Sequence, residues 1–273
     1  MDVVGIGVPM YDMVMNVSRM PERDGATGAN EVFFQGGGKV ATAMVAAARL
    51  GKKAGMIAKV GAGRKGRFIL EDFRYNGVDV SACVTGEEGT DSPFCLSLSE
   101  EEHKTRIFIG KQGTAGQLQP EEIDWDYVKS AKILHLENGE EASAQAARFA
   151  RKHGIVTVMD ADNYQEGIVR LIPWLDVFIA SEFFYKDMYG GLDYEEGLKK
   201  LLEGGVDTAI VTLGSEGSVG MTKKDGFFRT ESFRVDVRDT TGAGDVFHGA
   251  YIAGLLEGMA PRECTVFASA VAA

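Results

Sequence analysis

Short apolar runs alternate with amphipathic stretches along most of the 273-residue chain. The apolar runs predict buried strands over residues 3–8, 55–60, 133–136, 156–160, 177–180 and 208–212. Apolar positions at helical spacing predict helices over residues 39–50, 67–75, 142–153 and 194–203. This alternation is typical of a mainly parallel sheet covered on both faces, so we expect an α/β fold with three α/β/α layers.

Two stretches depart from this alternation and predict β-strands outside the main sheet. We therefore divide the chain into an α/β domain, from residues 1–11, 36–83 and 111–273, and a β subdomain, from residues 12–35 and 84–110. A small β subdomain built from two separate insertions predicts a lid, because a closing lid excludes water from a transfer reaction.

Composition and charge exclude several classes of protein. With 45% apolar and 25% charged residues, the chain resembles ordinary globular proteins rather than disordered chains or coiled coils. A net charge of −11, from 29 basic and 40 acidic residues, argues against a nucleic-acid partner, because phosphate backbones attract positive surfaces. No signal-peptide pattern and no apolar run of the ~18 residues that span a membrane is present, which predicts a cytoplasmic protein without a membrane partner.

The cysteines and histidines form no recognisable ligand pattern along the sequence. Cys83, Cys95 and Cys264 lie far apart, none of them in a C-x-x-C pair, and only four histidines accompany them. We therefore expect neither a zinc site nor a disulfide framework.

The segment Asp239–Asp245, with the sequence DTTGAGD, carries the most chemical information. Its glycines lead into a helical stretch, and the free backbone N–H groups at a helix start form an anion site that suits phosphate. Asp245 stands beside that site, where a carboxylate would repel an anionic ligand. Two interpretations remain open: Asp245 caps the helix, or it accepts the proton of a hydroxyl that attacks a phosphoryl group.

This segment resembles the C-terminal signature of the PfkB or ribokinase-like carbohydrate kinases, D-[TS]-x-G-A-G-D. The resemblance implies a ribokinase-like fold and transfer of a phosphoryl group from ATP to a sugar hydroxyl. It also implies that Asp245 is the catalytic base and that the backbone amides of Gly242, Ala243 and Gly244 hold the developing charge. Thr240, together with Gly242 and Gly244, would bind the nucleotide.

A second glycine cluster, GGGKVATAMVAAARLG over residues 36–51, resembles the N-terminal signature of the same family, GGKGxNxAxxxARLG. The alignment implies that Gly37, Gly38 and Lys39 bind the substrate. Thr42 replaces the Asn of the signature and lacks its paired amide geometry, so the pattern of bound hydroxyls is expected to differ. From the residues alone, the cluster also fits a helix start packed tightly against a strand.

Asp12 and Glu137 each come after a predicted strand, at the edge of the sheet where α/β proteins bind ligands. The resemblance implies that both contact sugar hydroxyls, whereas a turn-forming Asp12 and a solvated Glu137 are the alternatives. Thr212 and Gly214, in the sequence VTLGSEG, resemble the nucleotide-phosphate loop of the family. Arg106, in the second lid segment, either reaches the transferred phosphate as a forked cation or is an exposed strand residue.

The chain departs from the family pattern in two places. Ser181 and Phe184 occupy the positions of the N-x-x-E motif that helps to organise magnesium and phosphate, and Glu182 is a partial substitute. The magnesium ligands are therefore not assigned. Family members normally continue past the position of Ala273 to complete the adenine pocket, so a truncated sequence is one interpretation of this end.

A competing motif, GAGRKG over Gly61–Gly66, matches the dinucleotide fingerprint G-x-G-x-x-G, with Asp79 downstream. In dinucleotide-binding domains this motif usually follows the first strand, whereas here it follows the second. We therefore interpret it as a variant of a G-x-D-x-x-G turn of the carbohydrate kinases, with Gly63 in place of Asp.

The sequence thus predicts an ATP- and Mg²⁺-dependent kinase that phosphorylates a primary hydroxyl of a monosaccharide or related sugar, with Asp245 as general base. A nucleoside kinase shares every motif quoted above and is the first alternative. A sensor that binds sugar or nucleotide without catalysis is the second, motivated by Thr42, Ser181 and Phe184. Lid strands often pair between chains in this fold, which also predicts a homodimer through the β lid.

Overall fold

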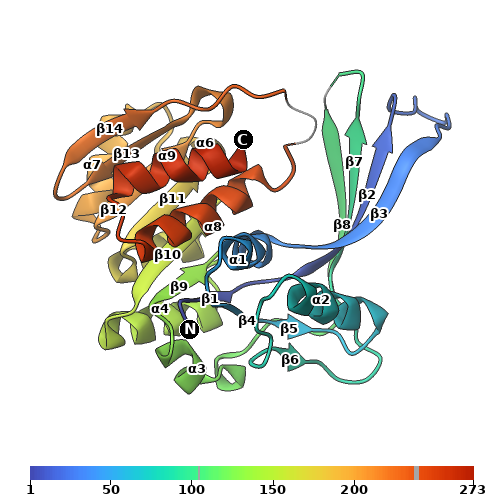
Figure 1. Cartoon of the computed structure of the whole chain (residues 1–273), viewed down its shortest axis with the longest axis horizontal. Helices are drawn as coiled ribbons and strands as arrows, with labels where there is room; N and C mark the ends of the chain where they lie inside the picture. Colours follow the sequence, from blue (N-terminus) through green and yellow to red (C-terminus); the bar gives the residue numbers. More distant parts are fainter. Residues whose placement is uncertain (104, 237–239) are drawn as a thin grey trace.

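The computed structural model describes residues 1–103, 105–236 and 240–273, and an eight-stranded sheet forms its centre (Figure 1). The strands lie in the order β14-β13-β12-β11-β10-β9-β1-β4. Their bounds are β1 (Val3–Ile6), β4 (Ala54–Ile57), β9 (Ile133–Leu136), β10 (Val156–Ala161), β11 (Val177–Ser181), β12 (Thr208–Thr212), β13 (Ser218–Thr222) and β14 (Gly226–Thr230). Neighbouring strands from β4 to β12 are parallel, and β13 and β14 add an antiparallel edge, so the predicted mainly parallel sheet is confirmed.

Helices cover both faces of this sheet, which confirms the three predicted layers. One face is covered by α1 (Lys39–Arg49), α2 (Arg64–Tyr75), α8 (Ala243–Leu256) and α9 (Pro261–Ala272). The other face is covered by α3 (Trp125–Lys129), α4 (Glu141–His153), α5 (Glu166–Leu171), α6 (Glu182–Tyr189) and α7 (Tyr194–Glu203). Figure 1 shows α1, α8 and α9 side by side on their face.

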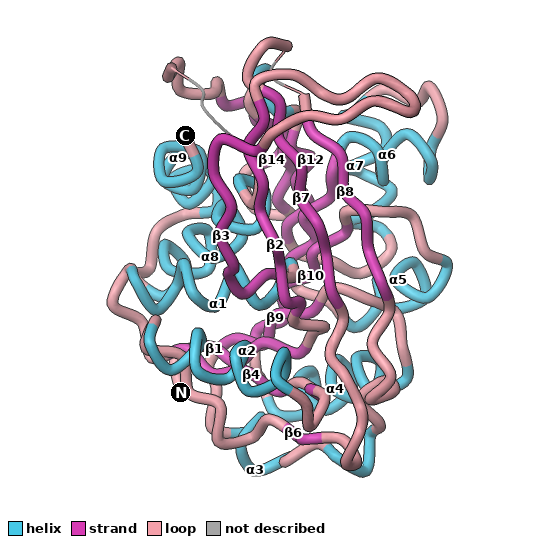
Figure 2. Tube along the Cα trace, turned by 90° about the vertical axis from the view of Figure 1, so that its right-hand side faces the viewer, coloured by secondary structure: helices cyan, strands magenta, loops and turns pink. Residues whose placement is uncertain are grey.

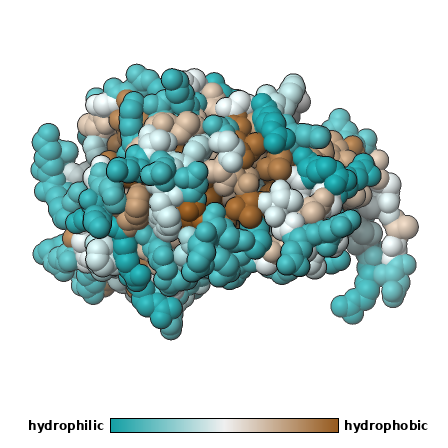
Figure 3. Space-filling view, turned by 90° about the horizontal axis from the view of Figure 1, so that it is seen from below, coloured by the Kyte–Doolittle hydropathy of each residue, from teal (hydrophilic) through white to brown (hydrophobic). Residues whose placement is uncertain are grey.

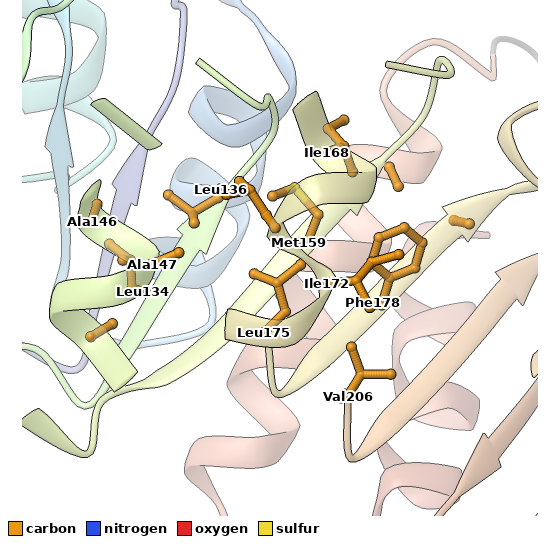
Figure 4. Close-up of a cluster of buried hydrophobic side chains, with 14 of the residues drawn as sticks. Leu134, Leu136, Ala146, Ala147, Met159, Ile168, Ile172, Leu175, Phe178 and Val206 are labelled. Carbon is orange, nitrogen blue, oxygen red and sulfur yellow. The ribbon is translucent and has the colours of Figure 1, made fainter. Parts of the chain in front are cut away.

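The core on the α4 face is built from alternate residues of the central strands. Leu134 and Leu136 of β9 and Met159 of β10 point the same way and pack against the small residues Ala146 and Ala147 of α4 (Figure 4). Each of these five side chains is completely buried. Burying a side chain of Leu or Met size contributes about 1.5–3 kcal/mol, so this layer fixes the positions of the strand ends that carry the polar residues described below.

On the opposite face, α1 packs closely against α8. A Cβ atom at Gly249 would lie 2.7 Å from Cβ of Ala46 and would also overlap the carbonyl oxygen of Ala43. Because α8 has no side chain there, the two helix backbones approach closely. This contact brings the glycine-rich starts of α1 and α8 to the same end of the sheet.

A separate four-stranded sheet stands off the main body, with the order β3-β2-β7-β8 (Figures 1 and 2). Its strands are β2 (Met10–Val17), β3 (Ala29–Gly37), β7 (Phe94–Glu100) and β8 (Arg106–Lys111). Both insertions that the sequence placed outside the main sheet therefore contribute strands to it. The short strand β6 (Val84–Thr85), which falls inside the second insertion, pairs instead with β5 (Lys59–Val60) in a two-stranded sheet.

An aromatic cluster joins the base of the four-stranded sheet to the α/β body. The ring of Tyr11 in β2 stacks on Phe34 of β3, with centroids 5.4 Å apart, and meets Phe68 of α2 edge-on at 4.9 Å. Aromatic pairs of this kind contribute about 0.5–1.5 kcal/mol beyond the area that they bury. The sheet is therefore anchored at one end while its far end extends from the body.

Hydrophilic residues cover most of the face shown in Figure 3, with a few hydrophobic residues near its centre. Within the described parts of the chain, none of the helices combines the length and the apolar character needed to cross a membrane.

Candidate active site

Glu137, at the end of β9, joins the end of β1 to the start of α1. Its carboxylate accepts hydrogen bonds from the backbone N–H of Val8, at 2.6 Å, and of Val40, at 2.8 Å. Burial raises the pKa of Glu137, while these two hydrogen bonds and the charge of Lys39 act in the opposite direction. The sugar contact that the sequence suggested for Glu137 stays a prediction; the structure shows that each carboxylate oxygen accepts one main-chain hydrogen bond, which gives Glu137 a structural role at the site.

The start of α1 depends on two glycines of the cluster. Gly38 is the N-cap residue with φ +101°, and a Cβ there would overlap the carbonyl oxygen of Val8. A Cβ at Gly37 would overlap the carboxylate of Asp12. A side chain at Gly38 would displace the Val8 carbonyl, and one at Gly37 would displace the Asp12 carboxylate. The two glycines therefore permit both the tight helix start and the close approach of Asp12.

Asp12 lies in β2, opposite Gln35 of β3 and Cys95 of β7. Its Oδ1 atom is buried and, within the described residues, has no hydrogen-bond partner. Burial raises the pKa of Asp12 to about 6. A buried acceptor without a donor is costly, so this carboxylate is suited to a ligand that brings hydroxyl groups.

The predicted anion site lies at the start of α8. Gly242 is the N-cap residue with φ +76°, and its carbonyl accepts the N–H of Val246 at 2.8 Å. The N–H of Ala243 donates to the carbonyl of Thr240 at 3.3 Å, whereas Gly244 is exposed and has open space around it. Since the first N–H groups of a helix have no intrahelical acceptor, the open end at Gly244 can receive an anion.

Asp245 is half-buried in the first turn of α8. Burial raises its pKa well above the ordinary value, and the charges of Asp160 and Glu137 act in the same direction, while Lys39 opposes them. A carboxylate with raised proton affinity is a better acceptor for a hydroxyl proton than an ordinary one. Asp239, the first residue of the DTTGAGD segment, lies outside the described residues.

The two glycine-rich helix starts meet at this site. A Cβ built at Gly242 would lie 3.6 Å from Cγ2 of Thr42 and 3.9 Å from Oδ2 of Asp245. Lys39 acts by its charge on Asp245, Glu137 and the buried Asp160. The structure therefore brings together residues of α1 and α8 that are about 200 positions apart in the sequence.

Thr212 is the last residue of β12, and Gly214 follows it by two residues. The Thr212 hydroxyl donates to the carbonyl of Ala180 in the neighbouring strand β11 at 3.4 Å. Gly214 begins the short helix η3 (Gly214–Glu216) with φ +56° and is exposed, with no atom near the position of a Cβ. A main chain without a side chain at this turn is open to a ligand.

Arg106 links the four-stranded sheet to the start of α8. Its guanidinium donates a hydrogen bond to the hydroxyl of Thr240 and lies 5.4 Å from the ring centre of Phe108. The contact joins β8 to the segment that precedes the glycines of α8. It is the observation that favours a role near the site for Arg106 over that of an ordinary exposed strand residue.

The positions of the missing N-x-x-E motif are occupied by structural residues. The Ser181 hydroxyl donates to the carbonyl of Asp162 at 2.6 Å and accepts the N–H of Phe184 at 3.0 Å, so it caps α6. Phe184 is completely buried. Glu182 pairs with Lys186, and this contact lowers the pKa of its carboxyl. These side chains do not fit a magnesium or phosphate site.

Two acidic residues of β10 and the loop after it escaped the sequence analysis. Asp160 is buried in the strand, and Asp162 is half-buried directly after it. Both carboxylates act on Asp245 and raise its pKa. The available signal was the sequence VMDAD at the end of a predicted strand, because such ends face the ligand cleft of α/β proteins.

The glycines of the competing motif are explained by packing. Gly61 donates its N–H to Ser92 Oγ at 2.9 Å, and a Cβ there would overlap the backbone of Asp91. A Cβ at Gly66 would likewise overlap the carbonyl oxygen of Gly61. Lys65 pairs with Asp91, so it is tied to the neighbouring loop.

A cavity of about 180 Å³ lies beside the ends of β1 and β9. Val8, Asn138 and Ser143 are among the residues that line it, and Lys59 stands at its wall. Asp12 and Asp245 do not line it. The cavity is therefore separate from the meeting point of α1 and α8, although the Val8 loop borders both.

Comparison with known proteins agrees with this geometry. A family model described as pfkB family carbohydrate kinase matches residues 2–273. The chain is 30% identical, over 260 residues, to a 5-dehydro-2-deoxygluconokinase of Clostridium perfringens, covering 87% of this chain and 77% of that protein. It is 27% identical, over 277 residues, to the enzyme of the same name from Bacillus subtilis, covering 94% and 84%.

Solved structures give the same result for the fold. A ribokinase from Thermotoga maritima superposes with a TM-score of 0.85 at 26% identity, covering 100% of this chain and 91% of that one. The ribokinase-like fold and the family resemblance expected from the sequence are thereby confirmed.

The double hydrogen bond of Glu137 gives a testable consequence. In Glu137→Gln, one acceptor oxygen becomes an NH₂ group, so the N–H of Val8 or Val40 loses its acceptor. We expect the free energy of unfolding to fall by about 1–3 kcal/mol in urea denaturation. The control is Glu141→Gln, an exposed residue of α4, for which a change within about 0.5 kcal/mol is expected. Equal stability of the two variants would contradict the structural role of Glu137.

Proposed function

We propose, from the premise that this chain belongs to the pfkB family of carbohydrate kinases, that it transfers the γ-phosphoryl group of ATP to a primary hydroxyl of a sugar or sugar acid. The supporting observation is the meeting of α1 and α8, which places Asp245 and an open glycine helix start on the same side as Asp12 and Lys39. The carboxylates supply a proton acceptor and a hydroxyl-binding group, and the helix start supplies an anion site.

In this mechanism each residue acts on a stated atom. Asp12 accepts hydrogen bonds from acceptor hydroxyls, and the Gly37 backbone leaves the space that its carboxylate occupies. Asp245 takes the proton of the attacking hydroxyl as its oxygen approaches phosphorus in line. The helix start at Gly244 holds the charge on the transferred group through its backbone N–H, a type of contact worth about 10²-fold or more in turnover.

Magnesium would accompany ATP, because it offsets charge between the β- and γ-phosphates. Magnesium prefers oxygen ligands, and Asp162 is the half-buried carboxylate after β10 that acts on Asp245. We propose that Asp162 contacts the ion or its water shell, in place of the residues at the N-x-x-E positions. Thr212, Gly214 and Thr240 would line the nucleotide side.

The four-stranded sheet would serve as the lid. It is anchored through Tyr11, and Arg106 of β8 bonds to Thr240 at the edge of the anion site. Closure over the acceptor would exclude water, which otherwise competes as phosphoryl acceptor. A cytoplasmic location, where ATP is available, is part of the same proposal.

The acceptor is best sought among hexose derivatives. The relatives quoted above are named for 5-dehydro-2-deoxygluconate, and the Asn of the family signature is replaced here by Thr42. Because Thr has one hydroxyl instead of an amide pair, it can satisfy fewer acceptor hydroxyls, as on a deoxy sugar. We therefore propose a keto or deoxy hexonate, or a related hexose, as the acceptor class.

Release of ADP with a panel of acceptors tests the function directly. The panel contains 5-dehydro-2-deoxygluconate, fructose, ribose and adenosine, each with ATP and Mg²⁺. Turnover with a sugar or sugar acid is expected. Selective turnover with adenosine would assign a nucleoside kinase, and binding without ADP release from any acceptor would assign a sensor.

Asp245→Asn tests the catalytic base. The amide keeps the size of the side chain but cannot accept the hydroxyl proton, so kcat is expected to fall by about 10²- to 10⁴-fold, while acceptor affinity changes little. Asp187→Asn, on the exposed side of α6, is the matched control and is expected to leave kcat unchanged. Retained turnover in the Asp245 variant would refute the assignment.

The protonation of Asp12 predicts a pH dependence of acceptor binding. Its pKa of about 6 means that the carboxylate gains a proton as the pH falls through 6 and then loses acceptor capacity. KM for the acceptor should therefore rise about tenfold between roughly pH 7 and pH 5. The raised pKa also means that the native state binds this proton more tightly than the unfolded chain does. The contribution of Asp12 to the folding stability of the ligand-free protein therefore falls as the pH rises from about 4 to 6. A KM that is independent of pH, or the same slope in Asp12→Asn, would contradict the prediction.

A homodimer through the lid is supported by apolar residues on both edge strands. Phe33 and Phe34 of β3 are 42% and 44% exposed, and Phe108 and Ile109 of β8 are 51% and 58% exposed. Exposed apolar patches mark interaction surfaces, and a second copy of the same sheet presents a complementary one. Light scattering should give twice 29.4 kDa, and Ile109→Lys should halve that mass. A single-chain mass for the unmodified protein would exclude the dimer.

A further inference from the structure

A buried group of two histidines and one carboxylate lies beneath the proposed active site. His135 of β9, Asp160 of β10 and His248 of α8 are 0%, 4% and 5% exposed. Each offers a potential ligand atom, and the three atoms lie within 4.8 Å of one another. The three residues come from elements that are widely separated in the sequence, so only the fold brings them together.

The hydrogen bonds of His135 leave one nitrogen free. Its Nδ1 lies 3.0 Å from the carbonyl oxygen of Val158. A carbonyl only accepts, so Nδ1 carries the proton and Nε2 retains its lone pair. Within the described residues Nε2 has no partner, although it is completely buried. A second bond from the far nitrogen to a backbone carbonyl is the usual way in which a metal-binding imidazole is oriented.

His248 and Asp160 have the spacing of two ligands of one ion. Nε2 of His248 lies 3.6 Å from Oδ1 of Asp160, which is too long for a hydrogen bond. Ligand atoms about 2.0–2.1 Å from a tetrahedral ion lie about 3.4 Å from one another, close to this separation. The rings of His135 and His248 are stacked, with centroids 5.3 Å apart and an angle of 25° between their planes.

The charges around the group favour a cation. Burial lowers the pKa of both His135 and His248, and the neutral imidazole is the form that binds metal ions. Asp160 and the nearby Asp245 are acidic, and Lys39 is the basic residue whose charge acts on this group. One lysine does not balance these carboxylates together with Glu137.

We propose that His135, Asp160 and His248 bind one divalent transition-metal ion, of the Zn²⁺ class. Two imidazole nitrogens and one carboxylate oxygen suit Zn²⁺ or Co²⁺, whereas the Mg²⁺ that accompanies ATP prefers oxygen ligands only. The ion would join β9, β10 and α8 at one point. Because His248 follows Asp245 by three residues on the same helix, the ion would also fix the first turn of α8.

Metal binding by the tag-free full-length chain tests this proposal without measuring activity. The protein is stripped with a chelator, dialysed, and titrated with Zn²⁺ against a competing chromophoric chelator. We expect one tightly bound ion per chain and a melting temperature higher by roughly 5 °C at a hundredfold excess over Kd. Co²⁺ should give the visible absorption of a site with nitrogen ligands.

Variants locate the ion. Asp160→Asn and His248→Gln preserve side-chain size and should weaken Zn²⁺ binding at least about tenfold. His153→Gln, on the exposed end of α4, should bind as the unmodified chain does. His103→Gln tests a second group, formed by the buried Glu100 and the exposed Glu102 and His103, and should also retain the tight ion.

Three results would overturn the proposal. The first is the absence of a stoichiometric ion and of any thermal shift in the unmodified chain, which would mean that water fills the space between the rings. The second is unchanged affinity in Asp160→Asn and His248→Gln. The third is loss of the tight ion in His103→Gln. Circular dichroism reports whether each variant folds. The first result needs no variant, because ion binding and the thermal shift are measured on the unmodified chain.

Discussion

The close packing of α1 on α8 is the constraint on which the rest of the site depends. Gly249 lets α8 approach the carbonyl of Ala43, and the completely buried alanines of α1 fill the interface without bulk. With the helix axes this close, the two glycine-rich starts meet, and Thr42 faces Gly242. A larger residue at the contact would separate the acceptor side of the site from the phosphate side, because packed helices do not deform continuously.

The site concentrates acidic groups where burial makes them expensive to ionise. Glu137 is compensated by two backbone N–H groups, and Asp12 has one oxygen without a donor among the described residues, while the charges of other carboxylates act on Asp245. In the proposed mechanism these three environments correspond to three different tasks of chemically similar side chains: fixing the backbone, binding hydroxyls and accepting a proton. A function that needs separate proton affinities at one place therefore accounts for an arrangement that is costly for stability alone.

Several parts of this picture were accessible from the sequence because they depend on local chemistry. The apolar runs predicted the strands of the main sheet, and the glycines before residues 39 and 243 predicted the starts of two helices. Other parts were missed or misjudged. Glu137 ends a strand as expected but faces the main chain, Lys65 pairs with Asp91, and Val84–Thr85 pairs with β5. Each of these outcomes depends on a partner that is distant in the sequence.

The sequence by itself determined the class of the fold and the family, and it led to the proposed residues for phosphate and proton chemistry, because helix starts, strand periods and signature motifs are contained in short segments. Only the tertiary structure decided which carboxylates share one buried volume, how each is compensated, and that two of four scattered histidines lie beside Asp160. The physical reason is that burial and Coulomb interactions act through space: they depend on distances set by the packing of whole elements, which no spacing along the chain encodes.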